Sequence, residues 1–198
     1  MSVTTSIYDF MNDYLEKDTV SFHMPGHKGS RLYRRFGYDR FLNHFMDLDI
    51  TEISGADNLF QAEGIIKGVQ DHYARLYNCK KSYLLINGSS GGNIASILAS
   101  VSTGKQLLMA RNCHKSVFNA LTLVGIRPVY VYPEMMEEYG ISGAIPAGEI
   151  ERLILENPDV EAVMIPSPNY YGICSDIKSI AGIAHQYRKV LIVDEAHG

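Results

Sequence analysis

Cysteine is scarce in this sequence and is spaced without a pattern. The three cysteines, Cys79, Cys113 and Cys174, form no Cys-x-x-Cys pair and leave one thiol over. A disulfide framework or a structural zinc site needs paired or closely spaced cysteines, so neither is expected. We therefore predict that all three are small buried residues and that the protein holds no metal.

An excess of basic charge is also missing. The chain carries 18 Lys and Arg against 22 Asp and Glu, which gives a net charge of −4, and its basic residues are scattered. Proteins that bind nucleic acid present a basic face or stripe. The composition therefore predicts no nucleic-acid partner and favours chemistry on small molecules.

Long apolar runs are lacking as well. The longest, residues 82–86 and 190–193, fall far short of the roughly 20 residues that span a bilayer. No charged and then apolar leader opens the sequence. We therefore expect a cytoplasmic protein that makes no membrane contact.

Short apolar runs alternate with helical patterns through most of the chain. Such alternation is typical of an α/β fold, a mostly parallel sheet flanked by helices. The predicted strands are residues 82–86, 106–110, 128–132, 160–165 and 190–193, and the predicted helices between them are 93–101, 116–124, 148–156 and 177–187.

The first third of the chain has a different pattern. Apolar residues at helical spacing predict helices over 7–17 and 63–78. Between them, residues 21–59 contain four glycines and show no sustained period, as expected of a long functional loop. We divide the chain into residues 1–60, with the first helix and the loop, and residues 61–198, with the sheet.

The carboxyl ends of the predicted strands are the places to look for a site, because ligands of open α/β sheets bind there. Ser89, Ser90 and Gly91 follow the first strand and precede a helix. Free amides and partial positive charge at a helix N-terminus can hold a phosphate. A plain Gly-rich turn with a serine cap is the alternative.

Other strand ends carry a carboxylate and imidazoles. His114 follows the second strand and could stack on a flat ring, although a helix cap or a solvated residue is the alternative. Asp194 and His197 follow the fifth strand. A carboxylate beside a pyridine nitrogen keeps that nitrogen protonated, so the ring can accept electrons when a substrate bond breaks.

The segment after the fourth strand, residues 166–172, is rich in turn formers. Ser167 and Asn169 offer a hydroxyl and an amide to the same edge of the sheet. A turn with no contact to a ligand is the alternative for this segment.

Three rival classes of site fit less well. The Asp-Glu-Ala-His run at 194–197 also occurs in helicases, but the partner phosphate loop fails because Gln106 stands where Ser or Thr is needed. The Gly-x-G-x-x-Gly spacing of dinucleotide-binding proteins is missing after the first strand. A metal hydrolase could use His23 and His27, but they lie in a Pro- and Gly-containing loop rather than in a His-Glu-x-x-His helix.

Several motifs together resemble one family. Residues 22–29 read Phe-His-Met-Pro-Gly-His-Lys-Gly, followed by Asp-Ile-Thr-Glu at 49–52 and Gly-Ala-Asp-Asn-Leu at 55–59. This combination resembles the group I ornithine/lysine/arginine decarboxylases, which are pyridoxal 5'-phosphate (PLP) enzymes of fold type I. The resemblance implies that 1–60 is an N-terminal helix with an active-site loop and that 61–198 is the first part of the PLP-binding major domain.

The same resemblance implies a cofactor and its contacts. PLP would be the cofactor, with an amino acid as the small-molecule substrate. The implied site residues are Ser89, Ser90 and Gly91 at the phosphate, His114 on the ring face, Asp194 at the pyridine nitrogen, His197 near the phenolic oxygen, and Asn169 or Ser167 as helpers. Asp194, His114 and His197 would be the catalytic residues.

For the activity, the resemblance implies decarboxylation of arginine, lysine or ornithine for polyamine biosynthesis by a homodimer. The family's Schiff-base lysine lies in a Ser-x-His-Lys motif beyond the Asp-Glu-Ala-His-Gly segment that ends this sequence, so residues 1–198 alone are expected to be inactive. Another PLP enzyme, such as an α-oxoamine synthase, and a non-catalytic binding module remain the alternatives.

Overall fold

The computed structural model describes residues 6–17, 19–23 and 26–198. Two compact units divide the chain, residues 1–50 and 51–198, and each is described separately. The division at residue 60 that the sequence predicts separates functional segments, not compact units, and it stays a prediction. Met24 and Pro25 of the family motif lie outside the described residues.

The described residues of the first unit form three short α-helices and one 3₁₀ turn. Helix α1 (Ile7–Glu16) begins with a capping box, in which the Ser6 hydroxyl accepts from the Asp9 amide at 3.1 Å and Asp9 accepts from the Ser6 amide. The predicted irregular loop instead holds α2 (Arg31–Arg35), α3 (Asp39–Asn43) and η1 (Phe45–Leu48). Helices of four or five residues are too short to show a helical period, which is why the sequence did not reveal them.

The second unit contains a four-stranded parallel sheet, in the strand order β2-β1-β5-β6. Its strands are β1 (Gln106–Ala110), β2 (Arg127–Val131), β5 (Val160–Pro166) and β6 (Val190–Asp194). All four match predicted strands to within one residue at each end. The two central strands are buried on both faces, so nearly every position must be apolar, and such continuous runs are easy to recognise in a sequence.

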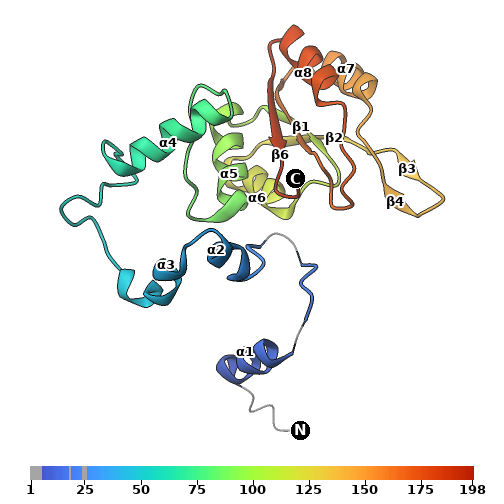
Figure 1. Cartoon of the computed structure of the whole chain (residues 1–198). Helices are drawn as coiled ribbons and strands as arrows, with labels where there is room; N and C mark the ends of the chain where they lie inside the picture. Colours follow the sequence, from blue (N-terminus) through green and yellow to red (C-terminus); the bar gives the residue numbers. More distant parts are fainter. Residues whose placement is uncertain (1–5, 18, 24–25) are drawn as a thin grey trace. The chain divides into compact units, whose positions relative to one another are not determined.

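Helices cover both faces of this sheet (Figure 1). One face carries α5 (Gly88–Ser100), packed against α6 (Lys115–Val124), and the other carries α7 (Ala147–Glu156), packed against α8 (Ile177–Gln186). Helix α4 (Ile65–Leu76) precedes α5. The α/β prediction is therefore confirmed.

One predicted strand does not form. Residues 82–86 have no regular secondary structure, with a bend at Ile86, and Ile86 is 85% exposed. A strand needs a neighbour, and no strand in the described part of the chain pairs with this segment. The side chain of Leu85 packs instead against Gly92 of α5, where an added Cβ would lie 2.7 Å from Leu85 Cδ1.

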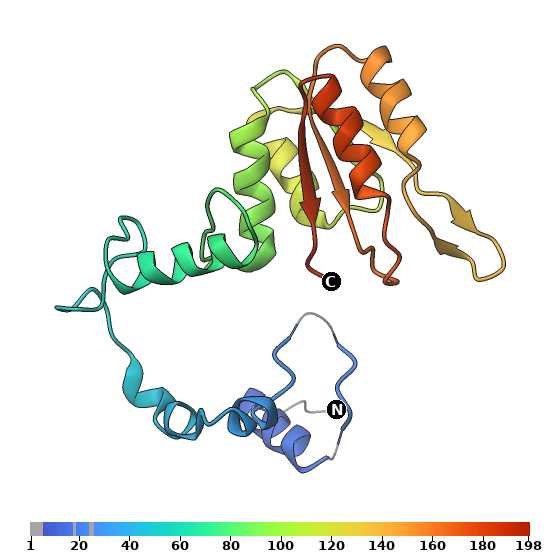
Figure 2. The same cartoon turned by 45° about the horizontal axis from the view of Figure 1, so that its top comes forward.

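A small antiparallel hairpin was not predicted. Strands β3 (Met135–Met136) and β4 (Ile141–Ser142) have two residues each, too few to show alternation. The hairpin extends away from the four-stranded sheet (Figure 2). Its base is closed where the Gly143 amide donates to the Glu134 carbonyl at 2.7 Å and the Glu134 amide donates to Ala144.

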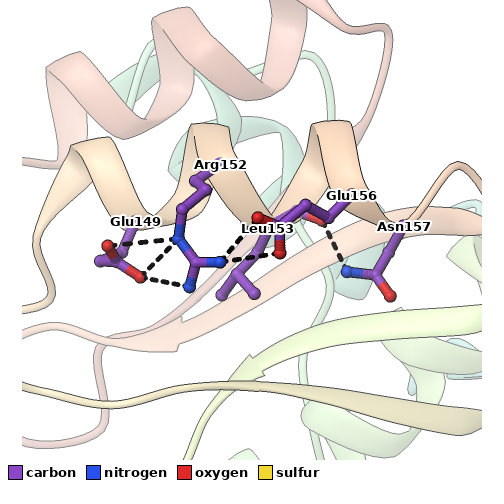
Figure 3. Close-up of polar contacts among 5 residues, drawn as sticks. All are labelled: Glu149, Arg152, Leu153, Glu156 and Asn157. Carbon is purple, nitrogen blue, oxygen red and sulfur yellow. Dashed lines mark hydrogen bonds and ion pairs between the residues drawn. The ribbon is translucent and has the colours of Figure 1, made fainter.

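The exposed face of α7 carries two ion pairs that share Arg152 (Figure 3). Arg152 donates to Glu149 one turn before it and to Glu156 one turn after it, with its shortest contacts at 2.7 Å. These bonds hold the pKa of Glu149 below its usual value. The helix ends where Asn157 Nδ2 donates to the Leu153 carbonyl at 2.9 Å.

Asp57 organises the chain before α4. Its φ is 67°, and its carboxylate accepts from the backbone amides of Glu63, Gly64 and Ile66 at 2.8 to 3.0 Å. These backbone donors hold the pKa of Asp57 far below its usual value. The Asp of the Gly-Ala-Asp-Asn-Leu motif thus acts as a cap for the start of α4.

The described residues include no helix with both the length and the apolar character needed to cross a membrane.

Replacement of Asp57 by Ala should free the turn before α4, because five backbone amides would lose their acceptor, those of Asn58, Glu63, Gly64, Ile66 and Lys67. We expect faster hydrogen exchange at Glu63, Gly64 and Ile66, measured by NMR or mass spectrometry, with little change in β1. In the native protein, since the pKa of Asp57 is depressed, this protection should be present above pH about 4 and disappear only as pH falls well below that value. Loss of the protection between pH 5 and 6 would contradict the assignment.

Replacement of Leu108 by Ala should destabilise the sheet. Leu108 is fully buried in β1, and such truncations cost about 2–5 kcal/mol. Leu123→Ala, on the exposed side of α6 at 66% exposure, is the matched control, with an expected change within about 0.5 kcal/mol. Urea unfolding followed by circular dichroism measures both.

Candidate active site

Asp194 is the central charged residue at the carboxyl edge of the sheet. It is the last residue of β6 and is only 9% exposed. One carboxylate oxygen, Oδ1, accepts from the Ala196 amide at 3.0 Å, and the other, Oδ2, accepts from Asn93 Nδ2 at 2.7 Å. A buried carboxylate is stable only with such donors, so these two bonds fix its orientation.

A chain of side-chain hydrogen bonds joins Asp194 to His114. Asn93 Nδ2 also donates to Ser116 Oγ at 3.2 Å, and Ser116 Oγ lies 2.9 Å from His114 Nδ1. His114 caps α6, since its Nδ1 accepts from the Ser116 amide at 3.2 Å. Because Nδ1 is an acceptor, the proton of the neutral ring lies on Nε2.

His114 is therefore the N-cap of α6, which was the alternative to a stacking role in the sequence analysis. The capping bond uses only Nδ1, and a stacking role for the ring stays a prediction.

A hollow of about 350 Å³ lies beside Asp194. The N-terminal half of α5 and the end of β6 form its walls. Its lining residues are Leu85, Ser89, Gly92, Asn93, Ser96, Ile192, Val193, Asp194, Glu195 and Ala196. Sites for small molecules usually measure about 300–1,000 Å³, so the hollow is large enough for a small ring.

Ser89, Ser90 and Gly91 lie in the first turn of α5, which begins five residues before the predicted start. Asn87 precedes the helix and makes no side-chain capping bond. Amides of the first turn have no partner within a helix, so this end can receive an anion. Of the three residues, Ser89 lines the hollow.

Asn169 and Ser167 have structural roles. Asn169 Nδ2 donates to the carbonyls of Ser142 and Gly143 at 2.8 and 3.1 Å, and its Oδ1 accepts from the amides of Tyr171 and Ile173. Both groups of this buried amide are thus used to join the turn after β5 to the hairpin. Ser167 Oγ accepts from the Ser175 amide at 3.1 Å. A cofactor contact from Asn169 would have to replace one of these bonds, and its assignment to the cofactor stays a prediction.

His197 is half-buried and does not line the hollow. Its ring meets Tyr170 edge to face, with the centroids 5.5 Å apart and the planes at 69°. The structure thus brings Ser89 and Asp194 to one hollow and joins His114 to Asp194 through two side chains. It places Asn169 and His197 outside that group, so the predicted role of His197 stays a prediction.

Cys113 lies in the core near Asp194. Its Sγ donates to the Met164 carbonyl at 3.6 Å. Burial, and next the negative charge of Asp194, raise the pKa of the Cys113 thiol to about 12. The prediction of three buried cysteines was right for Cys113 and wrong for Cys79 and Cys174, which are exposed.

Sequence reasoning missed Asn93 and Ser116, which link the site together. Asn93 opens the predicted helix over 93–101, where asparagine is a usual cap, so its type and position did not stand out. In the structure α5 begins five residues earlier, and Asn93 lies inside the helix. A polar residue that is buried there requires hydrogen-bond partners.

Comparison with known proteins identifies the family. Residues 5–198 match the model of the Orn/Lys/Arg decarboxylase major domain. The chain belongs to this family.

Two curated relatives come from Bacillus subtilis. The chain is 34% identical to uncharacterized protein YaaO over 99% of its own length and 41% of the relative, and 31% identical to arginine decarboxylase over 98% and 40%. The chain therefore spans about two fifths of the length of these relatives.

Solved structures support the fold. Lysine decarboxylase A from Pseudomonas aeruginosa is 26% identical, with a TM-score of 0.66 over 95% of this chain and 27% of that one. Cystalysin from Treponema denticola, whose structure contains pyridoxal 5'-phosphate, is 13% identical, with a TM-score of 0.54 over 79% of this chain and 39% of that one, and shows the fold alone. The fold is that of the fold-type I PLP enzymes, as the sequence predicted.

Iodoacetamide should separate the three thiols at pH 8. Cys79 and Cys174 are exposed and should react, whereas a thiol with a pKa of about 12 has only about one thiolate in 10⁴ molecules at that pH. Mass spectrometry of peptides from the native protein should find Cys113 unmodified, and modification of all three after denaturation is the control. Rapid labelling of native Cys113 would refute its buried position.

Proposed function

We propose that this chain is part of a PLP-dependent enzyme that decarboxylates a basic amino acid, arginine, lysine or ornithine, to the corresponding amine. The observation that carries the proposal is the buried Asp194 carboxylate, which faces a small-molecule hollow at the carboxyl edge of the sheet. Membership of the Orn/Lys/Arg decarboxylase family supports the substrate class.

The residues present fit PLP. The uncapped first turn of α5, with Ser89 and Ser90, suits its phosphate, because these amides and hydroxyls can donate to an anion. Gly92 lets Leu85 pack closely against α5, since a Cβ there would clash with the Leu85 side chain. This contact shapes the wall of the hollow.

Asp194 suits the nitrogen of a pyridine ring. Its two oxygens receive one donor each from the protein, and it forms no ion pair among the described residues. A carboxylate in this state can hold a proton on a ring nitrogen. When bound, PLP supplies an electron sink for the carbon that loses its carboxylate.

His114 would present its ring face to the cofactor. Capping of α6 through Nδ1 fixes the position of the imidazole and keeps its proton on Nε2. A ring fixed in this way can stack without the entropy loss of ordering a free side chain. His197 belongs to the same proposal as a residue near the phenolic oxygen.

The proposal extends to the whole protein. We propose a homodimer that works in the cytoplasm in polyamine biosynthesis, by analogy with the family. Large apolar side chains exposed on α4, among them Ile65 and Leu76, are compatible with a partner surface. Light scattering of the full-length protein measures the oligomeric state.

Replacement of Asp194 by Ala in the full-length protein expressed from its gene should remove most of the decarboxylation. Loss of a group that stabilises developing charge typically lowers kcat by about 10²–10³-fold or more. Amine and carbon dioxide release from arginine, lysine and ornithine is measured in parallel, which also identifies the substrate.

Glu156→Ala on the exposed face of α7 is the control, with normal activity expected. Normal turnover of the Asp194 variant would refute the assignment of this carboxylate. A wild-type protein that condenses an amino acid with an acyl thioester, and releases no amine, would favour the α-oxoamine synthase alternative.

A further inference from the structure

Asn93 stands in an unfavourable place for its side chain. It lies inside α5, where asparagine is less favourable than alanine by roughly 0.5–0.7 kcal/mol, and it is 7% exposed. A buried amide also loses its water, and only hydrogen bonds offset that loss. Its contacts therefore indicate what it does.

Both contacts of Nδ2 lead to residues of the candidate site. An amide nitrogen carries two hydrogens, and here Asp194 Oδ2 lies at 2.7 Å and Ser116 Oγ at 3.2 Å. Asn93 supplies the side-chain donor to Asp194, while the other carboxylate oxygen has only the backbone amide of Ala196. The Ser116 hydroxyl, which accepts from this nitrogen, also lies 2.9 Å from His114 Nδ1.

We propose that Asn93 is a positioning residue that orients the Asp194 carboxylate toward the ring nitrogen of the cofactor and ties it to the His114 imidazole. The inference rests on the proposed function, because it takes Asp194 as the partner of that nitrogen. Asp194 and His114 follow different strands and are 80 residues apart in sequence. The side chains of Asn93 and Ser116 join them through hydrogen bonds.

A purely structural role for Asn93 predicts a different result. If the amide only stabilised the packing of α5 on β6, its loss would lower the affinity for every ligand of the hollow by the same factor. If it orients Asp194, its loss should weaken chiefly those ligands that have a ring nitrogen. Two ligands that differ at this single ring position therefore separate the roles.

The experiment compares pyridoxamine 5'-phosphate with its 1-deaza analogue, in which a C–H replaces the ring nitrogen. Neither has an aldehyde, so neither forms an imine with a lysine, and dissociation constants report non-covalent contacts alone. Equilibrium dialysis is performed on the full-length protein expressed from its gene. The measured quantity is the ratio of the two dissociation constants.

The wild-type protein should prefer pyridoxamine 5'-phosphate by about tenfold or more, as expected for a hydrogen bond to a charged group. Asn93→Leu keeps the branched skeleton but removes the donors, and it should reduce this ratio about five- to tenfold while changing the affinity of the deaza ligand by less than about threefold. Asn157→Leu is the matched control. It removes an asparagine whose side-chain amide donates to the Leu153 carbonyl at the end of α7, away from the hollow, and it should keep the wild-type ratio.

Asp194→Asn separates this inference from the proposed function. Loss of the ratio in both Asp194→Asn and Asn93→Leu supports the inference. Loss in Asp194→Asn alone overturns the role of Asn93 and leaves the proposed function standing. Absence of any preference in the wild-type protein overturns both.

Folding of each variant is checked by circular dichroism. Where Asn93→Leu does not fold, Asn93→Ser is measured in its place, because its shorter hydroxyl does not span the distance to Asp194. An equal loss of affinity for both ligands in either variant, or failure of both to fold, overturns the proposal in favour of a structural role.

Discussion

A carboxylate withdrawn from water needs hydrogen-bond donors, and this requirement organises the carboxyl edge of the sheet. Asp194 receives one donor from its own loop, the Ala196 amide, and one from α5, the amide of Asn93. The second bond spans 101 positions of sequence. It therefore joins the N-terminal half of α5 to the end of β6, and residues of both elements line the hollow.

The parallel sheet explains why the chemistry is confined to its edge. Strands β1 and β5 are buried on both faces, and apart from Gln106 and Glu161 near their starts all their side chains are apolar. Polar groups then gather where the strands end, in the segments that contain Cys113, His114, Ser167 and Asp194. Burial also raises the pKa of the Cys113 thiol, so this thiol stays neutral beside Asp194 at neutral pH.

Most of the sheet could be predicted because the central strands β1 and β5 are buried on both faces and are almost wholly apolar, and because the edge strands β2 and β6 each contain a short apolar run. The segment 82–86 has the same appearance but no strand beside it, and a sequence pattern does not reveal whether a partner is present. The hairpin β3–β4 and the short helices α2 and α3 are too brief to show a period.

The candidate site was only partly visible in the sequence. Asp194 and Ser89 were named from their positions after a strand and at a helix start, and both line the hollow, while their contacts to a cofactor stay predictions. Asn169 was assigned to the cofactor by its place after a strand and by the family resemblance. Its amide bonds four backbone groups, and the assignment stays a prediction. Asn93 was missed because its partners, Asp194 and Ser116, are remote in the chain and only the fold brings them to it.

The hydrogen bonds of Asn169 connect the base of the β3–β4 hairpin to the turn that follows β5. A second tie runs beside it, from the Ile145 amide to Ser175 Oγ, and from the Ser175 amide to Ser167 Oγ. An insertion or deletion near Ser142 or Gly143 would shift both ties and be transmitted to the strand end next to the site. Length variation among related sequences should therefore be tolerated at the hairpin tip around Gly140, which projects into solvent, and selected against at its base.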